Sequence, residues 1–259
     1  MGSLTRNRSF IGGGKLWIRE KAAGSTTPQM YAFGNADSFS FAINEDKKTQ
    51  RNYQSPGGGN IASQSAITDV TASVNALSFQ PRTLALALRS LVKTVASAAI
   101  VGETHKVYKD ALEPLTAIPD DTQSITVTSQ DGNTTFTVNT DYVIEHGGIY
   151  IPEGSTITAA DSTNVGVDIK VDYNSLETYT IEAITQSAIE YEIFFNGFND
   201  ADNGKPTTVT CHKVKFSPTQ ALELISEDFG SLPMTFEVLA DDSITAAGES
   251  KYFNIKMVS

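Results

Sequence analysis

The feature that most constrains the fold of this chain is the alternation of apolar and polar residues. It occurs in two segments, one on each side of a long polar connection. Phe39, Phe41 and Ile43 occupy every second position of 37–44, and small apolar residues alternate with polar ones in 65–79. In a β-strand, successive side chains point to opposite faces, so each segment has one apolar and one polar side. The pattern predicts two strands of an antiparallel sheet that is buried on one face only.

The connection between these two strands, Glu45–Asn60, is far longer than the two to five residues of an ordinary hairpin turn. It carries charges of both signs and a tyrosine, and it ends in a Pro-Gly-Gly-Gly segment. Loops of this length in compact domains are usually either functional or disordered. We predict that it reaches a partner through Glu45, Asp46, Lys47, Lys48, Arg51, Tyr53, Pro56, Gly57 and Gly58.

The charge of the chain is concentrated in one segment. The net charge is −11, and residues 119–173 contain nine acids and one base, Lys170. The short, turn-punctuated strand patterns of this segment predict an acidic all-β module inserted into a larger domain. The single cysteine excludes an internal disulfide, and no apolar run is long enough for a signal peptide or a membrane span. We therefore expect a soluble protein made in the cytoplasm.

The remaining chain divides around this module. Residues 1–30 are expected to form an arm with one strand, Lys15–Arg19, although an edge strand of the main domain fits equally well. The main domain is predicted over 31–118 and 174–259. Leu84, Leu88, Leu91 and Val95 share one face of a 3.6-residue period, which predicts a helix packed on the sheet. A phase change near His212 predicts a β-bulge.

The sequence contains no motif that indicates catalysis or the binding of phosphate, zinc or nucleic acid. The chain has no phosphate-binding glycine motif and no nucleophile elbow. The three histidines are scattered, and one cysteine beside them does not make a structural zinc site. Basic residues cluster only in the first 21 positions, without aromatic interleaving, so a nucleic-acid-binding groove is not indicated. We predict a protein that is not an enzyme and needs no cofactor or metal.

The order of segments resembles a known family. The Phe33-Gly-Asn35 entry, the alternating strand, the charged loop, the leucine-rich segment and the closing stretches Val214–Phe216, Leu222–Phe229 and Phe236–Leu239 are similar to the major tail tube proteins of long-tailed bacteriophages. The resemblance covers about 30–118 and 174–259, and the inserted module resembles small β modules of phage tail proteins. A non-contractile tail is favoured, because an external module would obstruct a contractile sheath.

This resemblance implies a hexameric ring, stacked into a tube whose continuous inner β-barrel conducts DNA. The implied partners are other copies of the chain and the tape-measure, tail terminator and distal tail proteins, and the location is the virion. DNA would pass without specific binding. The fold class is then an antiparallel β-sandwich or barrel with one packed helix and a small all-β inserted domain. The loop 45–60 would contact a neighbouring subunit or the next ring.

On the alternation argument, one polar face would line the bore. The residues concerned are Ser38, Ser40, Asp69, Thr71, Ser73, Glu190, Glu192, Thr208 and Thr210. The acids among them would repel phosphate, although nearby Lys213 and Lys215 would offset this charge. Two alternatives remain open: another phage tail protein of related fold, and a carbohydrate-binding or adhesin β-sandwich that uses Tyr142, Tyr150 and Tyr173.

Overall fold

A computed structural model describes residues 9–21, 28–54, 56–157, 166–187 and 189–258. The chain forms two compact units: unit 1 comprises 1–92 and 181–259, and unit 2 comprises 93–180. Both are built from antiparallel strands, and the sheets do not close into a barrel. The mainly β, antiparallel part of the predicted fold class is confirmed.

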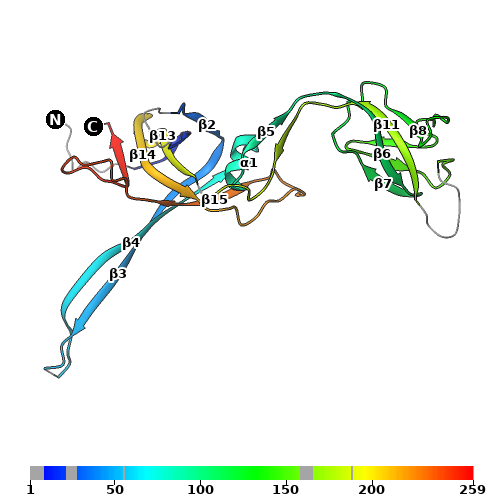
Figure 1. The fold of residues 1–259 in the computed structure, drawn as a ribbon. Coiled ribbons are helices and arrows are strands. Elements are labelled where there is room, and N and C mark those ends of the chain that lie inside the picture. The colour runs from blue at the N-terminus through cyan, green and yellow to red at the C-terminus, as the bar shows by residue number, and fades with distance from the viewer. Residues whose placement is uncertain (1–8, 22–27, 55, 158–165, 188, 259) are drawn as a thin grey trace. The chain divides into compact units, whose positions relative to one another are not determined.

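The large sheet of unit 1 contains strands from both ends of the chain (Figure 1). Its strands are β1 (Gly12–Glu20), β2 (Tyr31–Gly34), β3 (Ala36–Arg51), β4 (Asn60–Ala76), β13 (Glu190–Asn199), β14 (Lys205–Phe216), β15 (Leu232–Val238) and β16 (Phe253–Met257). The order is β2-β1-β13-β14-β15-β4-β3, with β16 also paired to β14. A short 3₁₀ turn, Asp200–Asp202, joins β13 to β14. The segment 1–30 is therefore no separate arm, because β1 lies between β2 and β13; residues 1–8 and 22–27 lie outside the described part.

The core of unit 1 forms where the sheet curls over its apolar face. Phe236 is buried, and its ring lies 6.2 Å from that of Phe39 and 4.9 Å from that of Phe216, measured between centroids. Phe39 also approaches Phe195 at 5.9 Å. Residues from β3, β13, β14 and β15 thus meet in one aromatic cluster. The alternation that predicted the strands also defines this core.

The predicted long helix is wrong in length. Helix α1 spans only Pro81–Ala87, and Arg89 adopts a left-handed conformation with φ 48° directly after it. The chain then forms β5 (Val92–Val95), which pairs with β12 (Thr178–Ile181). Leu91 and Val95 are exposed, so the leucine spacing did not mark a continuous buried face.

Unit 2 holds two three-stranded sheets. They comprise β6 (Ala99–Val107), β11 (Val167–Asn174) and β8 (Thr126–Ser129), and β7 (Ala111–Pro114), β10 (Gly148–Ile151) and β9 (Val143–Glu145). Buried residues such as Val107, Ile151 and Ile169 form its own core. The unit extends beyond the predicted 119–173 at both ends, because β6 pairs with β11 and β7 with β10. It contains thirteen acids and four bases, so the acidity does belong to this unit.

Candidate assembly surfaces

The connection predicted as a loop is mostly strand. β3 continues to Arg51 and β4 begins at Asn60, so the two strands form one long hairpin (Figure 1). We call residues 45–68 the hairpin arm. Pairing holds from Glu45 opposite Ile67 to Arg51 opposite Asn60. We predicted a loop here because most side chains on both faces of the arm are polar, so apolar and polar residues do not alternate.

The two strands of the hairpin arm are exposed along their whole length. In the described part every residue of 45–51 and 60–68 is exposed, including Ile61 and Ile67, and Tyr53 is 86% exposed. The predicted partner-contacting residues therefore divide: Glu45, Asp46, Lys47, Lys48 and Arg51 belong to β3, and Tyr53, Pro56, Gly57 and Gly58 to the tip. A two-stranded hairpin alone is at best marginally stable in water. Side chains of this kind are stabilised when another surface covers them.

The predicted polar residues lie together on one face of the sheet, which also carries Trp17 and Phe194. Ser40 pairs with Ser73 and Asn44 with Asp69, and both pairs are hydrogen-bonded, at 2.8 Å (Oγ to Oγ) and 3.0 Å (Nδ2 to Oδ2). The face continues through β15 and β14 to β13, because directly paired residues share a face. The register brings Ser38, Ser40, Asp69, Thr71, Ser73, Glu190, Glu192, Thr208 and Thr210 to the side opposite the aromatic core.

A bulge keeps this face continuous. Tyr191 pairs with Val214 but Ile193 pairs with Cys211, so His212 and Lys213 together lie opposite Glu192. The predicted bulge near His212 is confirmed. Beyond it the apolar phase of β14 shifts by one residue, and Lys213 and Lys215 join the polar face.

Ion pairs neutralise two of the acids of this face, Glu190 and Glu192. Lys213 and Lys215 place their Nζ atoms 3.1 and 3.4 Å from Glu190 Oε1, and Arg19 binds Glu192 at 2.6 Å. Partial burial would raise the pKa of Glu190, but hydrogen bonds and charge from the two lysines outweigh this and lower it. Outside the hairpin arm, the described strands bring five acids and five bases to this face: Asp37, Asp69, Glu190, Glu192 and Glu237, and Lys15, Arg19, Lys213, Lys215 and Lys256. The expected acidic surface is corrected to a charge-balanced one.

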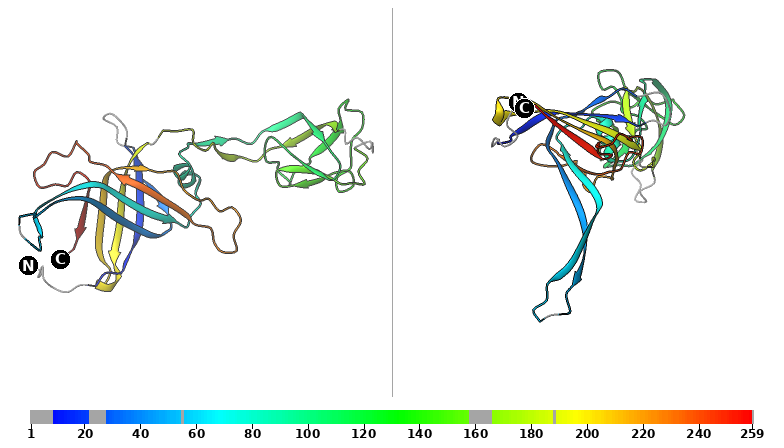
Figure 2. Two further views of the ribbon diagram at one scale, coloured as in Figure 1. Left: turned by 90° about the horizontal axis from the view of Figure 1, so that it is seen from below. Right: turned by 90° about the vertical axis from the view of Figure 1, so that its left-hand side faces the viewer.

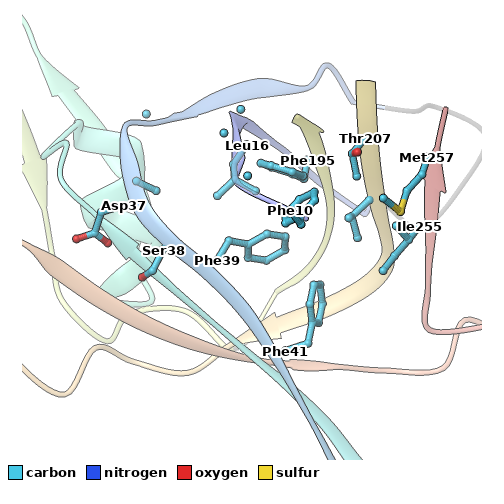
Figure 3. Close-up of a pocket in the computed structure, with 16 residues that line it drawn as sticks. Phe10, Leu16, Asp37, Ser38, Phe39, Phe41, Phe195, Thr207, Ile255 and Met257 are labelled. Carbon is cyan, nitrogen blue, oxygen red and sulfur yellow. The ribbon is translucent and has the colours of Figure 1, made fainter. Parts of the chain in front are cut away.

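The opposite, apolar face of the curled sheet is left partly uncovered. A groove of about 540 Å³ opens beside β3, between Phe39 and Phe41 on one side and Ile255 and Met257 on the other. Figure 3 shows the two phenylalanine rings pointing into it, while Asp37 and Ser38 point away. Only Asp37 among its lining residues is charged. An apolar groove beside an edge strand is a surface at which another chain can pack.

Unit 2 contains a half-buried polar cluster around Glu103. The Glu103 carboxylate accepts hydrogen bonds from Tyr173 Oη at 2.6 Å and from the Thr116 amide at 2.9 Å, and it contacts His105 Nε2 at 2.7 Å. Desolvation would raise the pKa of Glu103, but these hydrogen bonds lower it to about 2. Desolvation, then the hydrogen bond to Glu103, raise the pKa of Tyr173 to about 12. The cluster fixes β6 against the loop that follows β7.

The described residues do not indicate a metal site or a reactive thiol. None of their His, Cys, Asp and Glu side chains form a group of three or more that could hold a metal ion. Cys211 is buried, and desolvation raises its pKa to about 12, which keeps the thiol protonated. No helix in the described part of the chain is long and apolar enough to cross a membrane.

These features define a β-rich protein with a projecting hairpin and exposed apolar surface. The chain matches the model of a family described as "Protein of unknown function UCP028589" over residues 9–256, and it belongs to that family. No curated protein matches the chain.

Proposed function

We propose that this protein is a structural subunit that assembles with copies of itself, and that it forms the tail tube of a long-tailed bacteriophage. Six copies would make a ring, and stacked rings would make a tube through which DNA passes. The observation that carries the proposal is the hairpin arm, which presents apolar and charged side chains to solvent and packs on no core of its own chain.

The dimensions of the arm suit contact with a neighbouring subunit. Seven residues of β3 lie beyond Asn44, and at 3.2–3.4 Å per residue they extend roughly 20–25 Å. This reach is comparable to the diameter of a small domain. The open edges of β3 and β16 offer further backbone groups that a ring would cover or pair.

The polar face supports a role as the wall of a conduit. Hydroxyl and amide side chains dominate it on β3 and β4, and Glu190 and Glu192 are paired with basic side chains of the same subunit. A strongly basic wall would retain DNA by releasing counterions. A charge-balanced polar wall would stay hydrated and bind DNA phosphates weakly. DNA could then pass quickly without being repelled by the wall. The proposed role is therefore passage without specific binding, and it involves no catalysis or cofactor.

Of the three tyrosines that the adhesin alternative uses, only Tyr150 is partly exposed. Tyr142 and Tyr173 are buried in the core of unit 2, and the Tyr142 hydroxyl donates to the Ile125 carbonyl oxygen at 2.8 Å. Neither ring can stack on a sugar. Another phage tail protein, such as a terminator or distal tail protein, remains within the proposed class, and the partners proposed for a tube subunit are those proteins and the tape-measure protein.

Shortening the hairpin arm tests the proposal. A variant in which Asn-Gly replaces residues 45–68 would join Asn44 to Asp69 through a two-residue turn and keep their pairing. We expect the full-length protein to form rings or hollow tubes in negative-stain micrographs, and the shortened protein to remain a folded monomer. Tryptophan fluorescence during urea unfolding controls for folding. Equal assembly by both proteins, or a full-length protein that stays monomeric at every concentration, would contradict the proposal.

A further inference from the structure

The loop between β14 and β15, residues 217–231, presents apolar side chains to solvent. Leu224 and Phe229 are exposed, and Ile225 is 96% exposed. All of its charged residues are acidic, namely Glu223, Glu227 and Asp228. We call 217–231 the acidic loop. It is an apolar surface with a net charge of −3.

The acidic loop is anchored to unit 1. The Thr219 amide donates to the Ala87 carbonyl oxygen at 2.8 Å, and the Thr219 hydroxyl donates to the Pro233 carbonyl oxygen at 2.9 Å. Leu222 packs against the core. These contacts hold the loop at its base while its apolar side chains point outward. The acidic loop is therefore an anchored surface that is exposed to solvent.

The distal part of the hairpin arm has the opposite charge. We call residues 47–65 the distal half of the arm; they contain three bases and no acid, whereas Glu45 and Asp46 lie at the base of the arm opposite Ile67 and Ala66. Lys47 pairs with Ser65, and alternation places the exposed Ile61 further along the same face. Two exposed surfaces of one chain thus combine apolar side chains with opposite charges.

These two surfaces cannot meet within one chain. The acidic loop leads directly into Leu232, which pairs with Ala76 at one end of β4. The arm leaves the sheet at Thr68, eight residues along the same strand, or roughly 25 Å away. Figure 2 shows the arm and the loop before β15 at opposite ends of unit 1. Contact between them requires a second copy.

We propose that the distal half of the hairpin arm of one copy docks on the acidic loop of the next copy. The contact joins two different surfaces, so it is heterologous and propagates head to tail into rings or filaments. This inference rests on the proposed self-assembly and adds the surface that receives the arm. Charge complementarity would select the partner surface, and the apolar side chains would supply the buried area.

Charge reversal on each side tests the pairing. The loop-reversed variant carries Glu227→Lys and Asp228→Lys, and the arm-reversed variant carries Lys47→Glu and Lys48→Glu; all four residues are exposed. Each variant alone should raise the protein concentration needed for assembly about tenfold or more, measured by light scattering and sedimentation. A control with Glu182→Lys and Glu249→Lys makes the same net charge change as the loop-reversed variant, at exposed sites elsewhere.

Mixing the two variants decides the outcome. Each reversed arm then meets a reversed loop on the other variant, and each natural arm a natural loop, so assembly should return to within about threefold of the wild-type concentration. Single variants that assemble like the control would overturn the pairing, as would single defects that mixing does not rescue. The arm-shortened protein separates the two claims: if it fails to assemble while the reversed variants behave normally, the arm is needed but the acidic loop is not its receptor.

Discussion

Replacing Phe236 and Phe229 by alanine in separate variants should give opposite results, although the chemical change is the same. Phe236 is 1% exposed and lies among the rings of Phe39 and Phe216, whereas Phe229 is fully exposed in the acidic loop. Truncating a buried phenylalanine costs about 3–5 kcal/mol, because burial is lost and a cavity remains. An exposed one changes stability by about 0.5 kcal/mol or less.

The magnitude for Phe236→Ala is a large part of the stability of an ordinary domain, about 5–15 kcal/mol. At about 2–4 °C per kcal/mol, it corresponds to a fall in Tm of roughly 6–20 °C. Trp17 is the single tryptophan and lies in β1, so its fluorescence during urea unfolding reports unit 1 specifically. Phe229→Ala should leave the unfolding midpoint unchanged but weaken assembly.

The reasoning fails if the two variants lose similar stability. A loss below about 1 kcal/mol for Phe236→Ala would mean that the curled sheet does not bury this ring in solution. A large loss for Phe229→Ala would mean that the acidic loop packs on its own chain and is no presented surface.

Three further predictions concern packing, pH and independence of the units. Gly197→Val should lower the Tm of unit 1, because a Cβ at this position would lie 2.2 Å from the ring of Phe195, while Gly59→Ala, with nothing within 4 Å, should not. For Asp241, partial burial would raise the pKa, but hydrogen bonds from a lysine and a serine hold it at about 2, below its ordinary 3.8. This contribution to stability is complete above pH 3.8 and is lost as the pH falls toward 2. In Asp241→Asn, the urea midpoint of unfolding should therefore fall less between about pH 4 and about pH 2 than in the wild type. Residues 93–180 alone should give a cooperative thermal transition by circular dichroism, and a chain without them should still assemble; a molten fragment would contradict the first expectation.

The strands with one buried face could be predicted from sequence. Phe39, Phe41, Ile193 and their neighbours alternate because one side of the sheet meets the core, and the same register places Ser40 and Glu190 together on the other side. The bulge at His212 was visible for the same reason, since a bulge shifts the apolar phase. Local alternation is enough for these elements.

The arm, the short helix and the extent of unit 2 could not be predicted from sequence. Residues 45–51 and 60–64 form strands with no buried side, so apolar and polar side chains do not alternate clearly there. The leucine spacing after Pro81 continued past the point where the left-handed Arg89 ends the helix. β6 and β7 belong to unit 2 through pairing with strands distant in sequence. The ion pairs of Glu190 and Glu192 likewise depend on which strands become neighbours.

The central claim is that copies of this chain form a ring whose inner wall is the polar face. Cryo-electron microscopy of the assembled full-length protein tests it most directly. We expect rings of six subunits in stacked tubes, with Ser40, Thr71 and Glu190 on the inner wall and the hairpin arm on a neighbouring copy. A map that shows compact monomers, or tubes with these three residues on the outer wall, would contradict the account.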